Sequence, residues 1–111
     1  MAGWYELNKS TDGQFHFVLK AANSETILSS ERYAAKPSAL NGIASVQTNA
    51  PVAERYQRNT ASNGKHYFTL LAANGQVIGS SQMYATEATR DQGIASVMAN
   101  GATGTVKDGT G

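Results

Sequence analysis

Residues 13–50 read GQFHFVLKAANSETILSSERYAAKPSALNGIASVQTNA, and residues 64–101 read GKHYFTLLAANGQVIGSSQMYATEATRDQGIASVMANG. The second stretch repeats the first at an offset of 51 residues without a gap, and 17 of the 39 positions aligned between Asp12–Ala50 and Asn63–Gly101 are identical. Two copies are too few to stack into a solenoid. The repeat therefore predicts a pseudo-twofold pair of units that share one core.

Each copy opens with the alternation of a half-buried strand. In residues 15–21 every second position is apolar on one face, which is the period of a strand. Asp12-Gly13 and Asn63-Gly64 precede these strands, and such pairs tolerate the positive φ angles of tight hairpin turns. Asn23-Ser24 and Asn74-Gly75 follow them. The expected strands are 4–9, 14–21 and 26–30 in the first copy and 55–59, 65–72 and 77–81 in the second.

A helix is expected after the third strand of each copy. Pro37 fits the opening turn of the first helix, and Thr86 can cap the second. Gly42 and Gly93 fall inside these helices, where each costs roughly 1 kcal/mol relative to alanine. Because both copies carry the glycine, we expect a close approach of the helix backbone to the sheet or to the other helix.

The first helix also carries an apolar stripe, and each helix is followed by a strand. Leu40, Ile43 and Val46 recur at three-residue steps and predict the buried side of that helix. A short strand is expected at 104–107, because this stretch follows the second helix as 54–59 follows the first. Residues 108–111 are small and polar and are expected to fray.

The paired Ala-Ala-Asn and Gly-Ile-Ala-Ser-Val blocks resemble the YegP family, a small bacterial family of tandem-repeat proteins. The resemblance covers roughly residues 3–107. It implies an α+β fold in which two β-β-β-α-β units share one antiparallel sheet, with both helices on one face and the last strand of each unit swapped. The chain would then be a single domain over 1–111, built like a fused dimer from repeats of about 3–53 and 54–107. The resemblance implies no enzyme activity, cofactor or site residue.

Composition narrows the classes of partner. The 111 residues carry nine basic and eight acidic side chains, a net charge of +1, and no cysteine. Disulfides and thiolate metal sites are therefore excluded. Without a basic field we expect neither nucleic acid nor a membrane surface as a partner. The sequence begins without the features of a signal peptide and has no run of about 20 apolar residues, so we expect the cytoplasm.

The sequence contains no arrangement typical of a catalytic site. The chain has two histidines, and they do not repeat: His16 aligns with Tyr67, and His66 aligns with Phe15. Serines are plentiful, but no serine has a repeated histidine partner, and the scattered carboxylates form no repeated pair for acid–base or metal chemistry. We therefore expect no catalytic residue, no metal site and no cofactor, and we interpret the protein as a non-enzyme.

The alternation leaves one sheet face without helices. If both helices cover Phe17 and Phe68, the opposite face carries Val18, Leu71 and the four side chains that are the candidate ligand-binding residues: Trp4, His16, Lys20 and Tyr67. An uncovered face with Trp and Tyr is typical of a binding surface. The alternatives are ordinary cross-strand stabilisation, or a face covered in a dimer.

Tyr33 and Tyr84 recur just before each helix. We expect them to pack like a tyrosine corner with the hydroxyl bonded to backbone; a symmetric ligand pocket between them is the alternative. The sequence as a whole favours a small non-catalytic binding module of unknown ligand, as a monomer or weak homodimer. A structural or stress-related accessory protein that acts by self-association through exposed sheet edges is the alternative.

Overall fold

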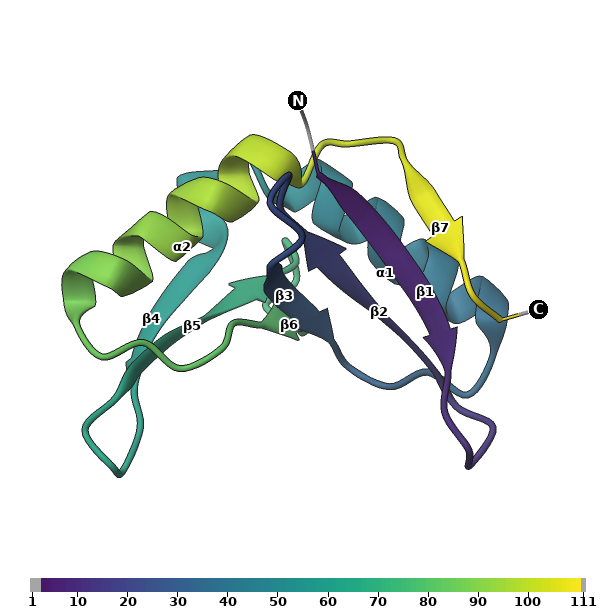
Figure 1. The fold of residues 1–111 in the computed structure, drawn as a ribbon, viewed down its shortest axis with the longest axis horizontal. Helices are drawn as coiled ribbons and strands as arrows, with labels where there is room; N and C mark the ends of the chain where they lie inside the picture. Colours follow the sequence, from purple (N-terminus) through teal and green to yellow (C-terminus); the bar gives the residue numbers. More distant parts are fainter. Residues whose placement is uncertain (1–2, 111) are drawn as a thin grey trace.

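The computed structural model describes residues 3–110 and contains one seven-stranded sheet and two helices. The strands lie in the order β4-β5-β6-β3-β2-β1-β7. Figure 1 shows β3 and β6 in the middle of the sheet, with α1 beside the β1–β2 side and α2 beside β4. The elements are β1 (Trp4–Lys9), β2 (Phe15–Lys20), β3 (Thr26–Ser30), α1 (Lys36–Asn49), a 3-10 turn (Ala53–Arg55), β4 (Tyr56–Thr60), β5 (His66–Leu71), β6 (Val77–Ser80), α2 (Glu87–Asn100) and β7 (Val106–Asp108).

The expected α+β fold with a shared sheet is confirmed, with one difference in detail. The strand after α1 is β4, which is also the first strand of the second repeat, so the sheet has the seven expected strands. β7 pairs with β1 of the first repeat, as a swapped strand should, but in parallel. The physical reason is the end of α2: Asn100 Oδ1 accepts a hydrogen bond of 2.8 Å from the backbone N–H of Gly3. The chain therefore leaves α2 at the start of β1 and must run beside it in the same direction.

One core joins both repeats. It lies between the helices and one face of the sheet, and its fully buried side chains come from both units. The expected apolar stripe of α1 needs one correction, because Leu40 is 44% exposed. Ala39, Ile43 and Val46 are buried instead. The stripe begins at Ala39 because positions i, i+4 and i+7 share a helix face, and Leu40 lies about 100° further round.

The interior glycines make the close contact that their recurrence predicted. A Cβ atom at Gly42 would lie 2.9 Å from Phe17 Cε2, and one at Gly93 would lie 3.2 Å from Phe68 Cε2, with a tyrosine closer still in each case. Those tyrosines are Tyr33 and Tyr84, which stack on the two phenylalanines with interplanar angles of 12° and 13°. Their packing role is thus confirmed. Within residues 3–110, however, no hydrogen bond joins either hydroxyl to the backbone.

Two other tyrosines bond to backbone instead. Tyr5 Oη donates to the carbonyl of Gly101 at 2.5 Å, and Tyr56 Oη donates to the carbonyl of Ala50 at 2.7 Å. Both acceptors are the residues that end the helices. Each bond therefore satisfies a carbonyl that a helix leaves without an intrahelical partner.

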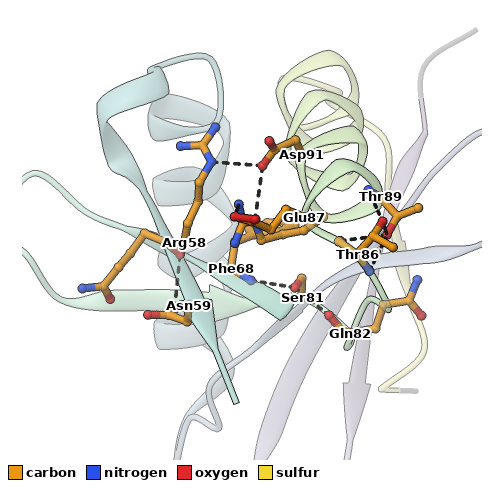
Figure 2. Close-up of polar contacts among 11 residues, drawn as sticks. Arg58, Asn59, Phe68, Ser81, Gln82, Thr86, Glu87, Thr89 and Asp91 are labelled. Atoms are coloured by element: carbon orange, nitrogen blue, oxygen red, sulfur yellow. Dashed lines mark hydrogen bonds and ion pairs between the residues drawn. The ribbon is translucent and has the colours of Figure 1, made fainter. Parts of the chain in front are cut away.

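Side chains also hold the start of α2 in place, as Figure 2 shows. Thr86 caps the helix, because its Oγ1 accepts from the backbone N–H of Thr89 at 3.1 Å. In return, Thr89 Oγ1 accepts from the backbone N–H of Thr86. One turn on, Arg58 of β4 reaches Asp91 at 3.0 Å. The predicted cap at Thr86 is therefore confirmed. Near the end of the chain, Asp108 belongs to β7 and the backbone N–H of Gly109 donates to the carbonyl of Leu7 at 2.8 Å, whereas position 111 of the expected tail lies outside the described residues.

Candidate functional site

The pairing of β1 with β2 brings two of the predicted residues together. Trp4 lies directly opposite Lys20 in the register, next to the Tyr5–Leu19 pair. Tyr5 and Leu19 are fully buried, so the pleat directs Trp4 and Lys20 to the face that the helices do not cover. Cross-strand neighbours of this kind have their Cβ atoms about 5 Å apart.

Two further residues complete the surroundings of Trp4. Its Nε1 donates to Glu6 Oε2 at 2.9 Å, and Lys107 Nζ lies 4.3 Å from the centroid of its ring. Lys107 belongs to β7 and faces Glu6 in the parallel register. An ammonium group over an indole is attracted by the π electrons of the ring. The indole is thereby fixed on the uncovered face between an acidic and two basic side chains.

Sequence reasoning missed both of these neighbours. Glu6 is one of the scattered carboxylates of the sequence, and Lys107 falls in the short strand expected at 104–107. The alternation of β1 places Glu6 on the same face as Trp4, which was an available signal. Lys107 had no such signal, because its place beside Trp4 depends on the parallel docking of β7.

His16 lies on the same face but at the other end of β2. It pairs with Asn8, and its Nδ1 lies 3.4 Å from Ser10 Oγ. Ser10 Oγ also accepts a hydrogen bond from Arg32. The Ser10–His16 distance is longer than the roughly 2.6–3.2 Å of an activated nucleophile, and no carboxylate in residues 3–110 bonds the imidazole. The arrangement is a polar surface contact.

Tyr67 lies apart from the other three. It belongs to β5 and pairs with Asn59 of β4. β3 and β6 lie between β5 and β2, so Tyr67 is three strand spacings from Lys20, about 14 Å. The structure thus brings together Trp4 and Lys20, and leaves His16 and Tyr67 as separate points on the uncovered face.

The remaining histidine does not form a catalytic arrangement. The Nδ1 of His66 is buried without a hydrogen-bond partner in the described part of the chain, and the residue is held by backbone bonds to Tyr84. Residues 3–110 contain no group of three or more His, Asp or Glu side chains placed to share a metal ion. Neither helix in that range is long and apolar enough to cross a membrane.

Comparison with known proteins identifies a family. The model of a domain of unknown function, DUF1508, matches residues 10–57 and again residues 61–108. The chain is 66% identical over 110 residues to the UPF0339 protein YegP of Escherichia coli K12, which covers 99% of this chain and 100% of that protein. The family model and the solved E. coli yegP structure carry labels of unknown function, and nothing in these labels indicates catalysis.

Solved structures show the same fold. The solution NMR structure of yegP from E. coli superposes with a TM-score of 0.95 at 67% identity, covering 100% of this chain and 96% of that one. The solution NMR structure of a UPF0339 protein from Shewanella oneidensis gives a TM-score of 0.93 at 60% identity, covering 99% of this chain and 93% of that one. The resemblance seen in the repeated blocks is therefore confirmed over the whole chain.

Proposed function

The chain belongs to the DUF1508 family, with two copies of its domain, and we propose that it is a small non-catalytic binding module. The proposed binding surface is the uncovered sheet face, centred on Trp4 and its cross-strand partner Lys20. The observation that carries the proposal is the indole of Trp4, held by Glu6 and covered by Lys107 on a face without helices. His16 and Tyr67 are proposed as outlying contacts on the same face.

The chemistry around Trp4 suggests the kind of ligand. An indole offers a flat apolar contact, and the two lysines beside it offer positive charge. We expect a small molecule that carries a planar group and a negative group. The net charge of +1 supports a small ligand over a nucleic acid or a membrane surface. The proposal further places the protein in the cytoplasm, as a monomer or weak homodimer.

Trp4 is the only tryptophan of the chain, so its fluorescence reports on this face alone. Titration with adenosine monophosphate is expected to change the emission of Trp4, and adenosine, which lacks the phosphate, is expected to bind more weakly. Amide NMR of labelled protein should place the shifts on β1 and β2. Short single-stranded RNA and cell-extract metabolites extend the set of probes. No shift on this face with any probe would overturn the proposal.

The second repeat supplies matched variants. Lys20→Leu introduces the residue that stands at the equivalent position, Leu71, so the strand should tolerate it. It is expected to weaken binding of the phosphate-bearing probe. The control is Lys65→Gln, which makes the same change of charge in an exposed turn and introduces the residue found at position 14. Equal weakening by both variants would mean a general charge effect and would contradict the assignment to Trp4 and Lys20.

Self-association is the second candidate, supported by the free sheet edges. β4 and β7 each have one neighbour, and Val106 of β7 is 37% exposed. Exposed edges can pair with another chain, which suits a structural or stress-related accessory protein. Sedimentation over a dilution series distinguishes the two candidates. A chain that stays strictly monomeric at high concentration would exclude self-association and leave the binding proposal intact.

A further inference from the structure

A cleft of about 310 Å³ lies on the helix side of the sheet, away from Trp4. The β2–β3 turn of the first repeat forms one wall, and the segment before α2, together with α2 itself, forms the other. The cleft is thus an inter-repeat feature. Ala21, Ile27 and Gly93 contribute its buried apolar part. Its polar lining consists of Asn23, Glu25, Gln82, Thr89, Gln92 and Ser96.

The polar chemistry of this lining is retained between the two repeats. The positions equivalent to Asn23 and Ser96 hold the same residues, Asn74 and Ser45. Thr89 corresponds to Ser38, which keeps a hydroxyl, and Gln92 corresponds to Asn41, which keeps a carboxamide. The uncovered sheet face behaves differently, because Trp4, His16 and Lys20 correspond to Arg55, Tyr67 and Leu71.

At two further positions of the cleft lining, the two repeats carry a carboxylate and a carboxamide in opposite order. Glu25 and Gln82 line this cleft, and their equivalents are Gln76 and Glu31. Each set therefore has one carboxylate and one carboxamide, although neither position keeps its residue. No lysine or arginine lines the cleft, so Glu25 is its one formal charge.

Folding alone does not account for this pattern. Asn23 and Asn74 are explained locally, because each Oδ1 accepts from the backbone N–H two residues on, at 3.1 and 3.0 Å. Thr89 completes the capping box of α2 with Thr86, but α1 has no side-chain cap, so the hydroxyl of Ser38 has no such role. Gln92 makes no hydrogen bond within residues 3–110. Ser45 and Ser96 also have a local role, because their Oγ atoms accept from Asn49 Nδ2 and Asn100 Nδ2 at 3.4 Å. Glu25 Oε1 accepts from Asn23 Nδ2 at 3.1 Å and keeps further acceptor capacity. The hydroxyl of Ser38, the carboxamide of Gln92 and the exchanged carboxylate of Glu31 make no side-chain hydrogen bond within residues 3–110, and they share only positions equivalent to the cleft lining or within it.

We propose that this cleft binds a small aliphatic amine in its protonated form. An ammonium group has three donors and no acceptor, and the lining offers a carboxylate, carboxamide oxygens and hydroxyl oxygens. Tyr84 supplies an aromatic wall whose ring is fixed by stacking on Phe68, with centroids 6.5 Å apart. Aromatic rings favour nearby cations. Figure 2 shows Gln82 and Thr89 with the Thr86 cap, on the side of α2 away from Arg58.

The test is an amide NMR titration with putrescine, with butane-1,4-diol as the uncharged probe of the same length. Putrescine is expected to shift the amides of Asn23, Glu25, Gln92 and Ser96, and the diol is expected to shift them much less. These amides lie on the helix side, so failure here is distinguishable from failure of the proposed site at Trp4. Absence of putrescine shifts in the cleft, or equal shifts with the diol, would overturn the proposal.

Variants taken from the other repeat sharpen the test. Glu25→Gln introduces the residue found at position 76 and is expected to weaken putrescine binding about fivefold or more, since bonds to charged groups are the stronger ones. Adding Gln82→Glu, the residue found at position 31, returns a carboxylate to the same cleft and should restore binding. Glu54→Gln changes the charge equally, outside the cleft lining, and should leave binding unchanged. Equal weakening by Glu25→Gln and Glu54→Gln, or no rescue by the double variant, would count against the cleft.

Discussion

Gly93 lies against Tyr84 so closely that a Cβ atom on the glycine would come within 2.7 Å of the tyrosine Cζ. Gly42 and Tyr33 repeat this relationship 51 residues earlier, where the distance to Cζ would be 2.9 Å. In both repeats the tyrosine occupies the space that a side chain on the helix would need. Each glycine therefore fixes how near its helix lies to the sheet, and near Gly93 it also shapes the floor of the cleft.

Gly93→Ala is expected to destabilise the fold by about 1–3 kcal/mol, because the added methyl group overpacks a filled space. This destabilisation is the net effect, after the gain of roughly 1 kcal/mol in helix propensity is counted. Urea unfolding measures the difference. Gly104→Ala is the control, since a Cβ there meets nothing within 4 Å. A Gly93→Ala variant as stable as the wild type would show that Tyr84 moves aside at little cost.

We expect the fold to lose stability at alkaline pH, because Tyr5 and Tyr56 are buried at the ends of the two helices. Burial raises the pKa of Tyr5 and of Tyr56 well above the ordinary 10.0, so the folded state favours the neutral phenols. Their contribution is fully present below pH 10 and is lost as the pH rises through the higher pKa of the folded state. The free energy of unfolding should therefore fall above pH 10, as measured by denaturant unfolding at stepped pH.

The double variant Tyr5→Phe and Tyr56→Phe tests this origin. It removes both bonds to the helix ends and should lower stability at pH 7 by about 1–3 kcal/mol. It should also flatten the loss above pH 10. Tyr67→Phe, which removes a hydroxyl from the uncovered face, serves as control. An unchanged alkaline slope in the double variant would assign the loss to other groups.

We expect β7 to detach from β1 at acid pH. The hydrogen bond from Lys36, together with those from Thr110, holds the pKa of Asp108 well below the usual 3.8. Because the pKa of Asp108 is lowered in the folded state, its ionised carboxylate stabilises the fold at pH values above about 4. This stabilisation is lost as the pH falls below about 4. Because Lys107 of β7 covers Trp4, release of the strand should shift the Trp4 emission to longer wavelength.

Asp108→Asn should show that shifted emission already at pH 7, and the acid-dependent change should be smaller. Asp12→Asn, in the exposed first turn, is the matched control. Wild-type emission of Asp108→Asn at both neutral and acid pH would mean that other contacts hold β7 against β1.

Ser24 predicts a stabilising substitution. Its φ of 73° lies in the left-handed region, where its equivalent Gly75 has a φ of 84°. A side chain in this region costs about 1–2 kcal/mol, and glycine avoids most of that cost. Ser24→Gly should therefore raise the free energy of unfolding by up to about 1 kcal/mol. Gly75→Ser should lower it, and thermal unfolding of both variants checks the pair. Stability changes of the opposite sign would show that flexibility of the unfolded glycine chain outweighs the strain.

Local patterns were enough to predict most elements of the fold. The period of two in 15–21, the turns at Gly13 and Gly64 and the cap at Thr86 act between residues that are close in sequence, so one copy suffices to read them. The 51-residue repeat predicted one core shared by two units, and buried side chains of both repeats form that core.

Tertiary structure alone decided the relationships between remote segments. The parallel docking of β7 puts Lys107 on Trp4, the insertion of β3 and β6 separates Tyr67 from Lys20, and the cleft joins Glu25 of one repeat to Gln82 of the other. Each depends on which strands become neighbours and on where a helix ends. Strand order and helix placement follow from side-chain packing between residues that are far apart in the sequence. The local sequence pattern of either repeat does not specify that packing.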